Sequence, residues 1–140
     1  MDHAPLHIKL ITPEKIIFSG DVLYVTVPTT TGVITVLPAH APLVSSIAKG
    51  ELVIKTKEEE MHFAVFAGVI DVRSGSIVNI LVDRSERAEE IDVARAEEAV
   101  ARAKKILEEK SHESDVDFAR FEALIEKELN RVKVGSKWAK

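Results

Sequence analysis

The 140-residue chain contains no cysteine. Disulfide bridges and thiolate metal sites are therefore impossible, and the absence fits a reducing compartment. The sequence also lacks the basic start and apolar centre of a signal peptide, and no apolar run approaches the ~20 residues that span a bilayer. We therefore expect no direct membrane insertion, so that any link to a membrane runs through another protein.

An excess of basic residues is missing as well. The sequence has 19 Lys and Arg against 23 Asp and Glu, a formal net charge of −4. The balance is similar in both halves, with seven against nine in residues 1–85 and twelve against fourteen in residues 86–140. Domains that bind a phosphate backbone usually carry a basic excess. Nucleic acid is therefore not an expected partner.

Motifs of catalysis and of metal binding are absent too. The sequence contains no G-x-S-x-G, no H-E-x-x-H and no G-x-x-x-x-G-K-[ST], and its five histidines show no ligand spacing. A hydrolytic set of His40, Ser45 and Asp71 is conceivable, but His40 is explained more simply as a surface histidine in a proline-bounded loop. We predict no catalytic residues, no metal site and a chain that is not an enzyme by itself.

Short apolar runs separated by turn residues fill the first part of the chain. Hydrophobic residues make up 46% of the sequence, which is enough for one core. No helical pattern interrupts the runs, so a parallel βαβ sheet is excluded, and their spacing predicts an all-β sandwich or barrel of eight or nine strands. We expect Ser19-Gly20-Asp21 to separate two strands, and 52–54 to pair with 63–66. The expected strands are 6–10, 16–18, 22–27, 33–37, 43–48, 52–54, 63–66, 69–72 and 77–82.

The pattern changes near Arg84, after which no Gly or Pro occurs until Gly135. Two apolar series at helical spacing follow, joined by a polar connector at 110–115, and they predict an antiparallel helical hairpin. The fold prediction is thus a β-sandwich domain over residues 1–86 and a two-helix arm over 87–140. The first series is Val93, Ala96, Val100, Ala103 and Leu107; the second is Phe118, Phe121, Ile125, Leu129 and Val132.

The predicted arm is only weakly stabilised by its own packing. Alanine buries little surface, so at about 25 cal/mol per Å² the hairpin gains only a few kcal/mol. Two helices of this length are marginal alone. Such an arm could dock, open or extend while the β domain stays folded.

Cationic side chains recur along the arm. Arg95 and Arg102 lie seven residues apart on one helical face, and arginine can hold phosphate oxygens bidentately. Asp92 could accept a hydrogen bond from an adenine amino group or a ribose hydroxyl. Asp92 is equally explained as a helix N-cap. Asp117 repeats the same Asp-x-Ala-Arg pattern at the second helix start, so two similar helix starts explain both without a ligand.

With these motifs in order, the chain resembles, almost end to end, the epsilon subunit family of F-type ATP synthases, called delta in mitochondria. The family implies a ten-stranded sandwich followed by a helix–loop–helix. The motifs that carry the resemblance are Phe18-Ser19-Gly20, Leu37-Pro38-Ala39-His40-Ala41-Pro42-Leu43, Phe66-Ala67-Gly68-Val69, Ile91-Asp92-x-x-Arg95-Ala96 and Asn130-Arg131-Val132.

The resemblance also implies a role. The sandwich binds the gamma shaft and the c-ring of the membrane sector, and so helps to couple proton translocation to ATP synthesis. The arm permits turnover when folded and inhibits ATP hydrolysis when it extends into the alpha/beta catalytic head. The expected place is peripheral, on the cytoplasmic face of the bacterial plasma membrane or the stromal face of a thylakoid.

Two sets of contact residues follow from the resemblance. No cofactor is required, but ATP is a candidate regulatory ligand, and Gly32 and His40 are candidate c-ring contacts. Lys127 stands where ATP-binding relatives carry arginine, and Phe121 where small residues are usual, so we predict that ATP binding is weak or absent. The candidate ATP ligands are Glu86, Ile91, Asp92, Arg95, Ala96, Arg102, Arg120, Lys127 and Arg131.

Two alternative functions remain at this point. The chain could be a factor that inserts a helical hairpin into a large enzyme such as RNA polymerase, with Glu113 and Asp115 at the tip. Those factors, however, place the hairpin before the globular domain. It could also be a stand-alone ATP sensor, which needs only the arginines of the arm.

Overall fold

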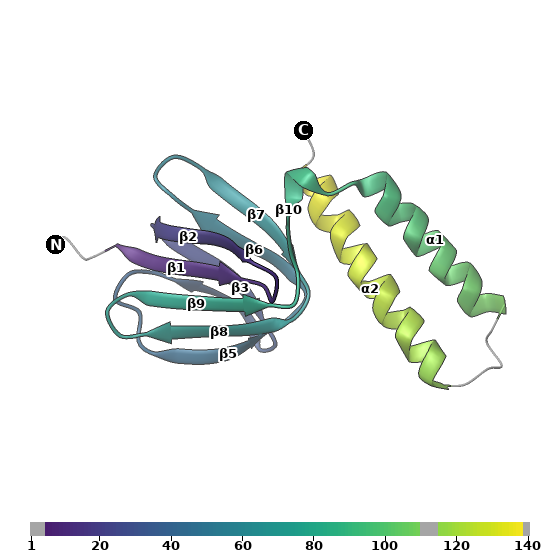
Figure 1. Cartoon of the computed structure of the whole chain (residues 1–140), viewed down its shortest axis with the longest axis horizontal. Coiled ribbons are helices and arrows are strands. Elements are labelled where there is room, and N and C mark those ends of the chain that lie inside the picture. Colours follow the sequence, from purple (N-terminus) through teal and green to yellow (C-terminus); the bar gives the residue numbers. More distant parts are fainter. Residues whose placement is uncertain (1–4, 110–114, 139–140) are drawn as a thin grey trace. The chain divides into compact units, whose positions relative to one another are not determined.

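The computed structural model describes residues 5–109 and 115–138. The chain divides after Arg87 into a β domain and a helical domain, one residue later than the predicted boundary (Figure 1).

Ten strands make up the β domain, and their bounds are β1 (Leu6–Ile11), β2 (Ile16–Val22), β3 (Tyr24–Thr29), β4 (Gly32–Val36), β5 (Leu43–Ile47), β6 (Gly50–Lys55), β7 (Glu60–Val65), β8 (Gly68–Arg73), β9 (Ile77–Val82) and β10 (Ser85–Arg87). They form one sheet in the order β10-β7-β6-β3-β5-β8-β9-β1-β2, with β4 paired to β3. The sheet folds over on itself into two layers (Figure 1). The predicted all-β sandwich is confirmed.

The core lies between the two layers and is built from alternating aliphatic side chains. Leu6, Ile8 and Leu10 of β1 are all fully buried, whereas Lys9 between them is exposed. This period of two is the pattern expected of a strand with one face on the core. Phe63 is the largest fully buried side chain, and it lies opposite Leu52 in the β6–β7 pair, as predicted for that hairpin.

Pairing differs from the prediction at three places. Ser19-Gly20-Asp21 does not separate two strands but continues β2, with Gly20 opposite Ile8, because pairing with β1 outweighs the local turn tendency. The short β10 contains no apolar run, yet it pairs with β7. Finally, β1 pairs with β9 in parallel, a long-range contact for which no local signal exists.

The helical domain contains a 3₁₀ turn, η1 (Ala88–Glu90), and two helices, α1 (Val93–Glu109) and α2 (Asp115–Lys137). On α1 the buried side chains are Ala96, Val100 and Ala103, which confirms the predicted seam. The end of α2 packs against the start of α1, so the two helices are antiparallel. A Cβ built on Gly135 would lie 2.8 Å from Cγ2 of Val93, which shows how closely the backbones approach.

The predicted face of α2 is partly wrong. Phe118 and Leu129 are 46% and 45% exposed, while Glu128 is only 7% exposed. The position of Gly135 against α1 explains the difference, because residues seven positions apart share a helical face. That face carries Phe121, Ile125, Glu128, Val132 and Gly135 at steps of four and three, and we call it the α2 seam. Of the predicted connector at 110–115, residues 110–114 lie outside the described residues, and Asp115 begins α2.

Candidate functional site

The Ile91-Asp92-x-x-Arg95-Ala96 motif forms the start of α1. The Asp92 carboxylate accepts a hydrogen bond from the Arg95 backbone N–H at 3.0 Å, which is the contact of a helix N-cap. Ile91 and Ala96 are 8% and 0% exposed, and Ile91 lies beside Gly135. The charged side chains of the motif, Asp92 and Arg95, are both exposed. The N-cap interpretation of Asp92 is confirmed, and it accounts for the aspartate without a nucleotide.

Arg131 on α2 already has an acidic partner. Its Nη1 donates to Oε2 of Glu128 at 2.7 Å, and the two side chains are 19% and 9% exposed. An anion that bound Arg131 would have to displace or approach this carboxylate. Lys127 is half-buried, and Arg120 and Arg102 are exposed.

Within the helical domain, the predicted ATP ligands are spread along both helices. Asp92, Arg95 and Arg131 lie toward the end of the hairpin where Gly135 meets α1. Arg120 is eleven residues before Arg131 on α2, about 16 Å along the axis at 1.5 Å per residue. Arg102 lies about 10 Å along α1 from Arg95 by the same rise. Glu86 belongs to the β domain, in β10 opposite Ala64.

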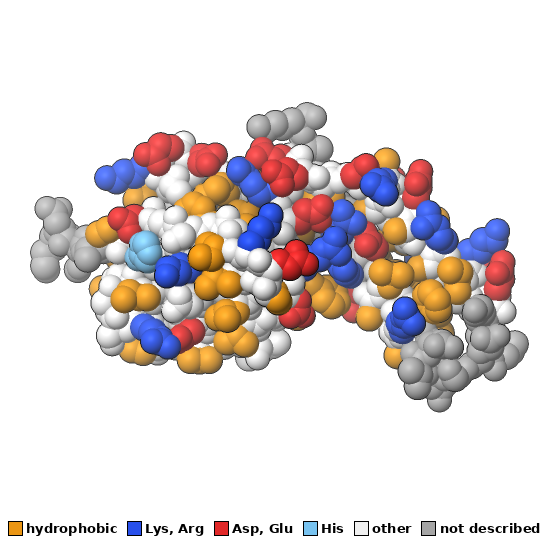
Figure 2. All heavy atoms as spheres, in the orientation of Figure 1, with side chains coloured by type: hydrophobic (Ala, Val, Ile, Leu, Met, Phe, Trp, Pro, Cys, Tyr) orange, Lys and Arg blue, Asp and Glu red, His pale blue; other side chains and the backbone are white. Residues whose placement is uncertain are grey.

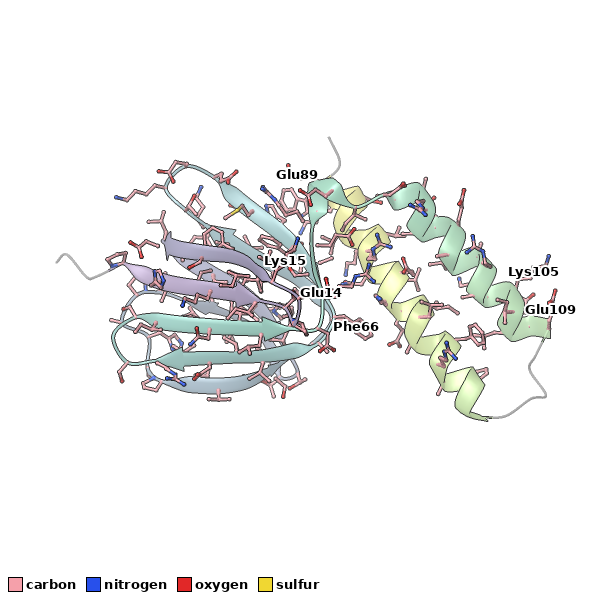
Figure 3. All side chains as sticks on the ribbon, viewed as in Figure 1. Glu14, Lys15, Phe66, Glu89, Lys105 and Glu109 are labelled. Atoms are coloured by element: carbon pink, nitrogen blue, oxygen red, sulfur yellow. The ribbon has the colours of Figure 1, made fainter. Side chains whose placement is uncertain are left out.

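Charges of both signs cover the helical domain. Lys105 and Glu109 extend from the exposed side of α1, one turn apart (Figure 3). In the space-filling view, lysine and arginine alternate with aspartate and glutamate over the visible face of the domain (Figure 2). An anionic ligand would therefore have to be selected by individual arginines, since a broad basic surface is not seen there.

One predicted c-ring contact, Gly32, begins β4, and the other, His40, lies four residues beyond its end. Gly32 begins the strand with φ 131°, in the region that favours glycine, and a Cβ there would meet nothing within 4 Å. His40 follows the strand in a turn, where its backbone N–H donates to the Leu37 carbonyl at 3.1 Å. At about 3.3 Å per residue, β4 itself spans about 13 Å between them.

Exposed apolar side chains lie between those two residues. Val33 is 70% exposed and Leu37 is 54% exposed. We call Gly32, Val33, Leu37 and His40 the β4 surface. Exposed large apolar side chains that lie close together in the chain are candidates for contact with another protein.

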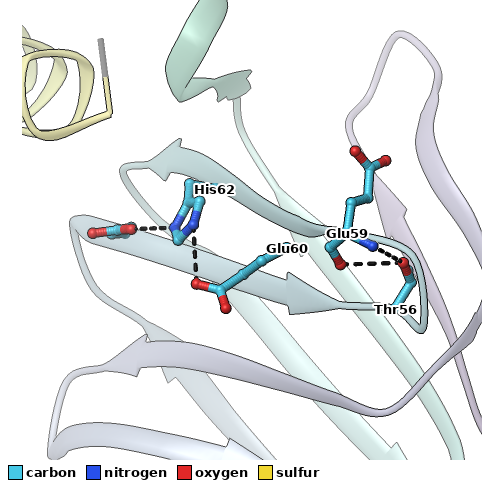
Figure 4. A network of polar contacts seen from close by, with 5 residues as sticks. Thr56, Glu59, Glu60 and His62 are labelled. Atoms are coloured by element: carbon cyan, nitrogen blue, oxygen red, sulfur yellow. Dashed lines mark hydrogen bonds and ion pairs between the residues drawn. The ribbon is translucent and has the colours of Figure 1, made fainter. Parts of the chain in front are cut away.

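A second polar cluster connects β6 and β7 (Figure 4). The His62 ring is only 10% exposed, with Nδ1 at 2.6 Å from Oε1 of Glu51 and Nε2 at 3.1 Å from Oε1 of Glu60. In the adjoining turn the Thr56 hydroxyl accepts from the Glu59 N–H at 3.0 Å. This cluster joins the two strands of a hairpin. Across the described parts of the chain, no group of three His, Cys, Asp or Glu residues could hold a metal ion.

The residues of the conceivable hydrolytic set each have other partners. Nδ1 of His40 lies 2.6 Å from the Ala41 carbonyl oxygen, and the Ser45 hydroxyl donates to the Ser46 carbonyl at 3.5 Å. The Asp71 carboxylate pairs with Arg73 at 2.9 Å. These contacts do not assemble a nucleophile, base and orienting acid.

The β domain also has a polar hollow of about 470 Å³. It contains none of the predicted ligands or contact residues. Glu14 and Lys15 from the β1–β2 turn, which are labelled in Figure 3, belong to its lining. Its lining is Thr12, Glu14, Lys15, Ile17, Asp83, Arg84 and Ser85. Within residues 5–109 and 115–138, neither helix has the length and apolar character needed to cross a membrane.

Comparison with known proteins agrees with this architecture. Residues 5–88 match the family model for the β-sandwich domain of the ATP synthase delta/epsilon chain, and residues 89–135 match the model for its long α-helix domain. An ATP synthase epsilon chain of Ruminococcus albus is 36% identical over 96% of this chain and 98% of its own length. One of Chloroflexus aggregans is 42% identical over 93% and 91%.

Solved structures share the fold at low sequence identity. A chain in the Euglena gracilis mitochondrial ATP synthase, from a structure of OSCP, F1 and the c-ring, superposes with a TM-score of 0.78. The identity is 20%, and the match covers 91% of this chain and 79% of that one. A chain from the central stalk and c-ring of the Tetrahymena thermophila mitochondrial ATP synthase gives 0.63 at 16% identity, over 98% of both. The family matches span both domains, and the chain therefore belongs to the delta/epsilon family of ATP synthase subunits.

Proposed function

We propose that this chain is a non-catalytic rotor subunit of an F-type ATP synthase, which couples proton translocation to ATP synthesis and inhibits ATP hydrolysis through its helical arm. The observation that carries the proposal is the contrast between the two domains. The β domain has a large aliphatic core of its own, whereas α1 buries mainly alanine and valine against α2. A body that holds its position and an arm that can move suit a coupling and regulatory role.

The proposed partners of the β domain are the gamma shaft and the c-ring. Both similar solved structures are of ATP synthase assemblies with a c-ring, and one of them is of the central stalk, which supports the assignment. The β4 surface offers exposed apolar side chains for such a contact. Through these partners the subunit would be peripheral to the membrane, on its cytoplasmic face in a bacterium.

The proposed partner of the extended arm is the alpha/beta catalytic head. Helices α1 and α2 contain 17 and 23 residues, 40 together. If they ran end to end at 1.5 Å per residue, they would reach about 60 Å. That length would allow the arm to enter a catalytic head from its base and obstruct hydrolysis there.

ATP is at most a weak ligand of the folded arm in this proposal. Arg131 is paired with Glu128, Lys127 cannot make the bidentate contact of an arginine, and Arg120 lies about 16 Å along α2 from Arg131. Titration of the isolated chain with ATP tests this. Sub-micromolar affinity would contradict it.

The truncation experiment tests the regulatory role directly. Full-length chain and residues 1–88 are added to an F1 complex that lacks this subunit. Both are expected to co-purify with gamma, and only the full-length chain is expected to inhibit ATP hydrolysis. Equal inhibition by the two would remove the regulatory arm from the account. Binding to RNA polymerase instead of gamma would favour a hairpin-insertion factor, and ATP binding without a stalk partner would favour a sensor.

A further inference from the structure

The polar hollow of the β domain lies where two strands end together. Strands β1 and β9 are parallel, with Ile11 opposite Leu81, so their carboxyl ends meet at one edge of the sheet. The β1–β2 turn and the segment between β9 and β10 leave from that edge and supply most of the lining. The volume of about 470 Å³ is within the range of small-molecule sites. All of the lining residues belong to the β domain.

Four charged side chains without ion-pair partners line the hollow. Glu14 and Lys15 come from the β1–β2 turn (Figure 3), and Asp83 and Arg84 come from the segment before β10. Among the described residues, none of the four forms an ion pair, although each segment supplies one charge of either sign. Charges of both signs are therefore available to a second molecule.

Backbone hydrogen bonds hold both segments in place. The Thr12 N–H donates to the Lys15 carbonyl at 2.9 Å, and the Thr12 hydroxyl donates to the same carbonyl at 3.1 Å. In the other segment, the Asp83 N–H donates to the Ala67 carbonyl at 3.2 Å. The charged groups are thus carried by ordered backbone, so a ligand would bind with a smaller loss of conformational entropy than in a flexible loop.

Ser85 adds an unused donor to the same lining. In the described part of the chain, its hydroxyl is the only buried side-chain oxygen or nitrogen without a hydrogen-bond partner. Buried polar groups in folded proteins are nearly always hydrogen-bonded, so this hydroxyl needs an explanation. Rotation between staggered χ1 positions redirects a serine hydroxyl without moving the backbone, and a ligand in the hollow would give it an acceptor.

We propose that the hollow binds a small zwitterion with one carboxylate and one ammonium group. Arg84 and Lys15 bind the carboxylate, since a guanidinium holds a carboxylate bidentately. Glu14 and Asp83 accept hydrogen bonds from the ammonium. The equal numbers of acidic and basic side chains disfavour a ligand with a single charge. Ile17 is the only hydrophobic residue in the lining, which disfavours an aromatic ligand such as a nucleobase.

The affinity should be modest. All four charged side chains are exposed, and water screens exposed charges, so we expect dissociation constants in the millimolar range. The inference concerns the isolated chain and does not depend on the proposed function.

Titration of the full-length chain, followed by its amide NMR spectrum at constant ionic strength, tests the proposal. The probes are free glycine, β-alanine and 4-aminobutyrate, which separate the two charges by increasing distances. Butyrate and butylamine each keep only one of the charged groups. At least one zwitterion should shift amides within residues 12–17 and 83–85 in a saturable way, about fivefold or more tighter than butyrate or butylamine. Equal binding of a single-charge molecule, or no saturable shift with any zwitterion, would overturn the proposal.

Charge-matched variants locate the site. Lys15→Gln and Arg84→Gln should each weaken binding of the best zwitterion about fivefold or more. Lys57→Gln is the control, because it removes the same charge from an exposed position in the β6–β7 turn, outside the lining. It should change binding by less than about twofold. Equal losses in all three variants would contradict the proposal, since they would reflect attraction to the net charge of the chain.

Ser85→Ala distinguishes a ligand contact from a structural role. The substitution removes an unpaired hydroxyl, so the midpoint of urea unfolding should not fall, while binding of the zwitterion should weaken about threefold or more. A lower midpoint with unchanged binding would overturn the assignment of Ser85 to the site.

Discussion

The contacts that stabilise the β domain internally differ in kind from those that close the helical hairpin. Leu6, Ile8 and Leu10 are fully buried within a network of ten strands. The hairpin closes instead on Ala96, Val100, Ala103 and Gly135, and of these the alanines and the glycine have little or no side-chain surface to bury. At about 25 cal/mol per Å² of apolar surface, the first arrangement gives a domain with its own stability and the second gives a closed state that small changes can shift.

The largest expected effect concerns the β core. Ile8→Ala removes a fully buried side chain and should lower the free energy of unfolding of the β domain by about 2–5 kcal/mol. Urea denaturation measures the change. Val44→Ala is the control, since Val44 is 70% exposed and its truncation should cost less than about 0.5 kcal/mol. Similar losses from both would mean that burial does not set the stability of this domain.

The next effect concerns the closest approach of the two helices. Gly135→Ala places a Cβ 2.8 Å from Val93 and 3.0 Å from Ile91. Overpacking costs about 1–3 kcal/mol, while the better helix propensity of alanine returns up to about 1 kcal/mol. We expect the hairpin to open more often, with faster amide exchange in α1 and α2 and unchanged exchange in the β domain.

A second substitution identifies the cause of that opening. Val93→Ala shortens the side chain that the new Cβ would meet, so the Gly135→Ala/Val93→Ala variant should recover part of the lost protection. A double variant that exchanges even faster than the sum of the two single variants would show that Gly135 acts through something other than this contact.

A smaller effect is expected at the start of α1. Asp92→Ala removes the acceptor for the Arg95 N–H and should weaken the helix by about 1 kcal/mol. Asp92→Asn keeps an N-cap oxygen and should be nearly neutral. Thermal unfolding followed by circular dichroism at 222 nm measures the stability of both variants. If Asn is as damaging as Ala, the carboxylate has a role besides capping.

The smallest effect on stability is expected on the β4 surface. Val33→Asp alters a side chain that is 70% exposed, so the free energy of unfolding should change by less than about 0.5 kcal/mol. The amount of c-ring that binds to the variant chain should nevertheless fall several-fold, because a charge replaces an apolar contact. The matched control is Val44→Asp, equally exposed but on β5. Equal loss of capture by both would leave the β4 surface without a specific role.

The sequence predicted the features that repeat locally. Alternation located the strands of the core, as Leu6, Ile8 and Leu10 show, and the step of three and four located the seam of α1. Long-range pairing left no such pattern. The parallel contact of β1 with β9 and the continuation of β2 through Gly20 depend on which strands meet, and local propensity does not encode that.

The candidate site was predictable to a smaller extent. The N-cap role of Asp92 followed from its residue type and position, and the contact at 3.0 Å confirms it. The burial of Glu128 was missed because Leu129, the next residue, fitted the apolar series equally well. Only the close approach at Gly135 fixes which side of α2 meets α1.

Residue-resolved hydrogen exchange of the full-length chain, alone and with gamma and F1, tests the central claim most directly. The account predicts that amides of α1 and α2 exchange together through an opening that leaves β1, β8 and β9 protected, and that their exchange rates change when the stalk partners are added. Helices as strongly protected as those strands, with no response to the partners, would contradict it.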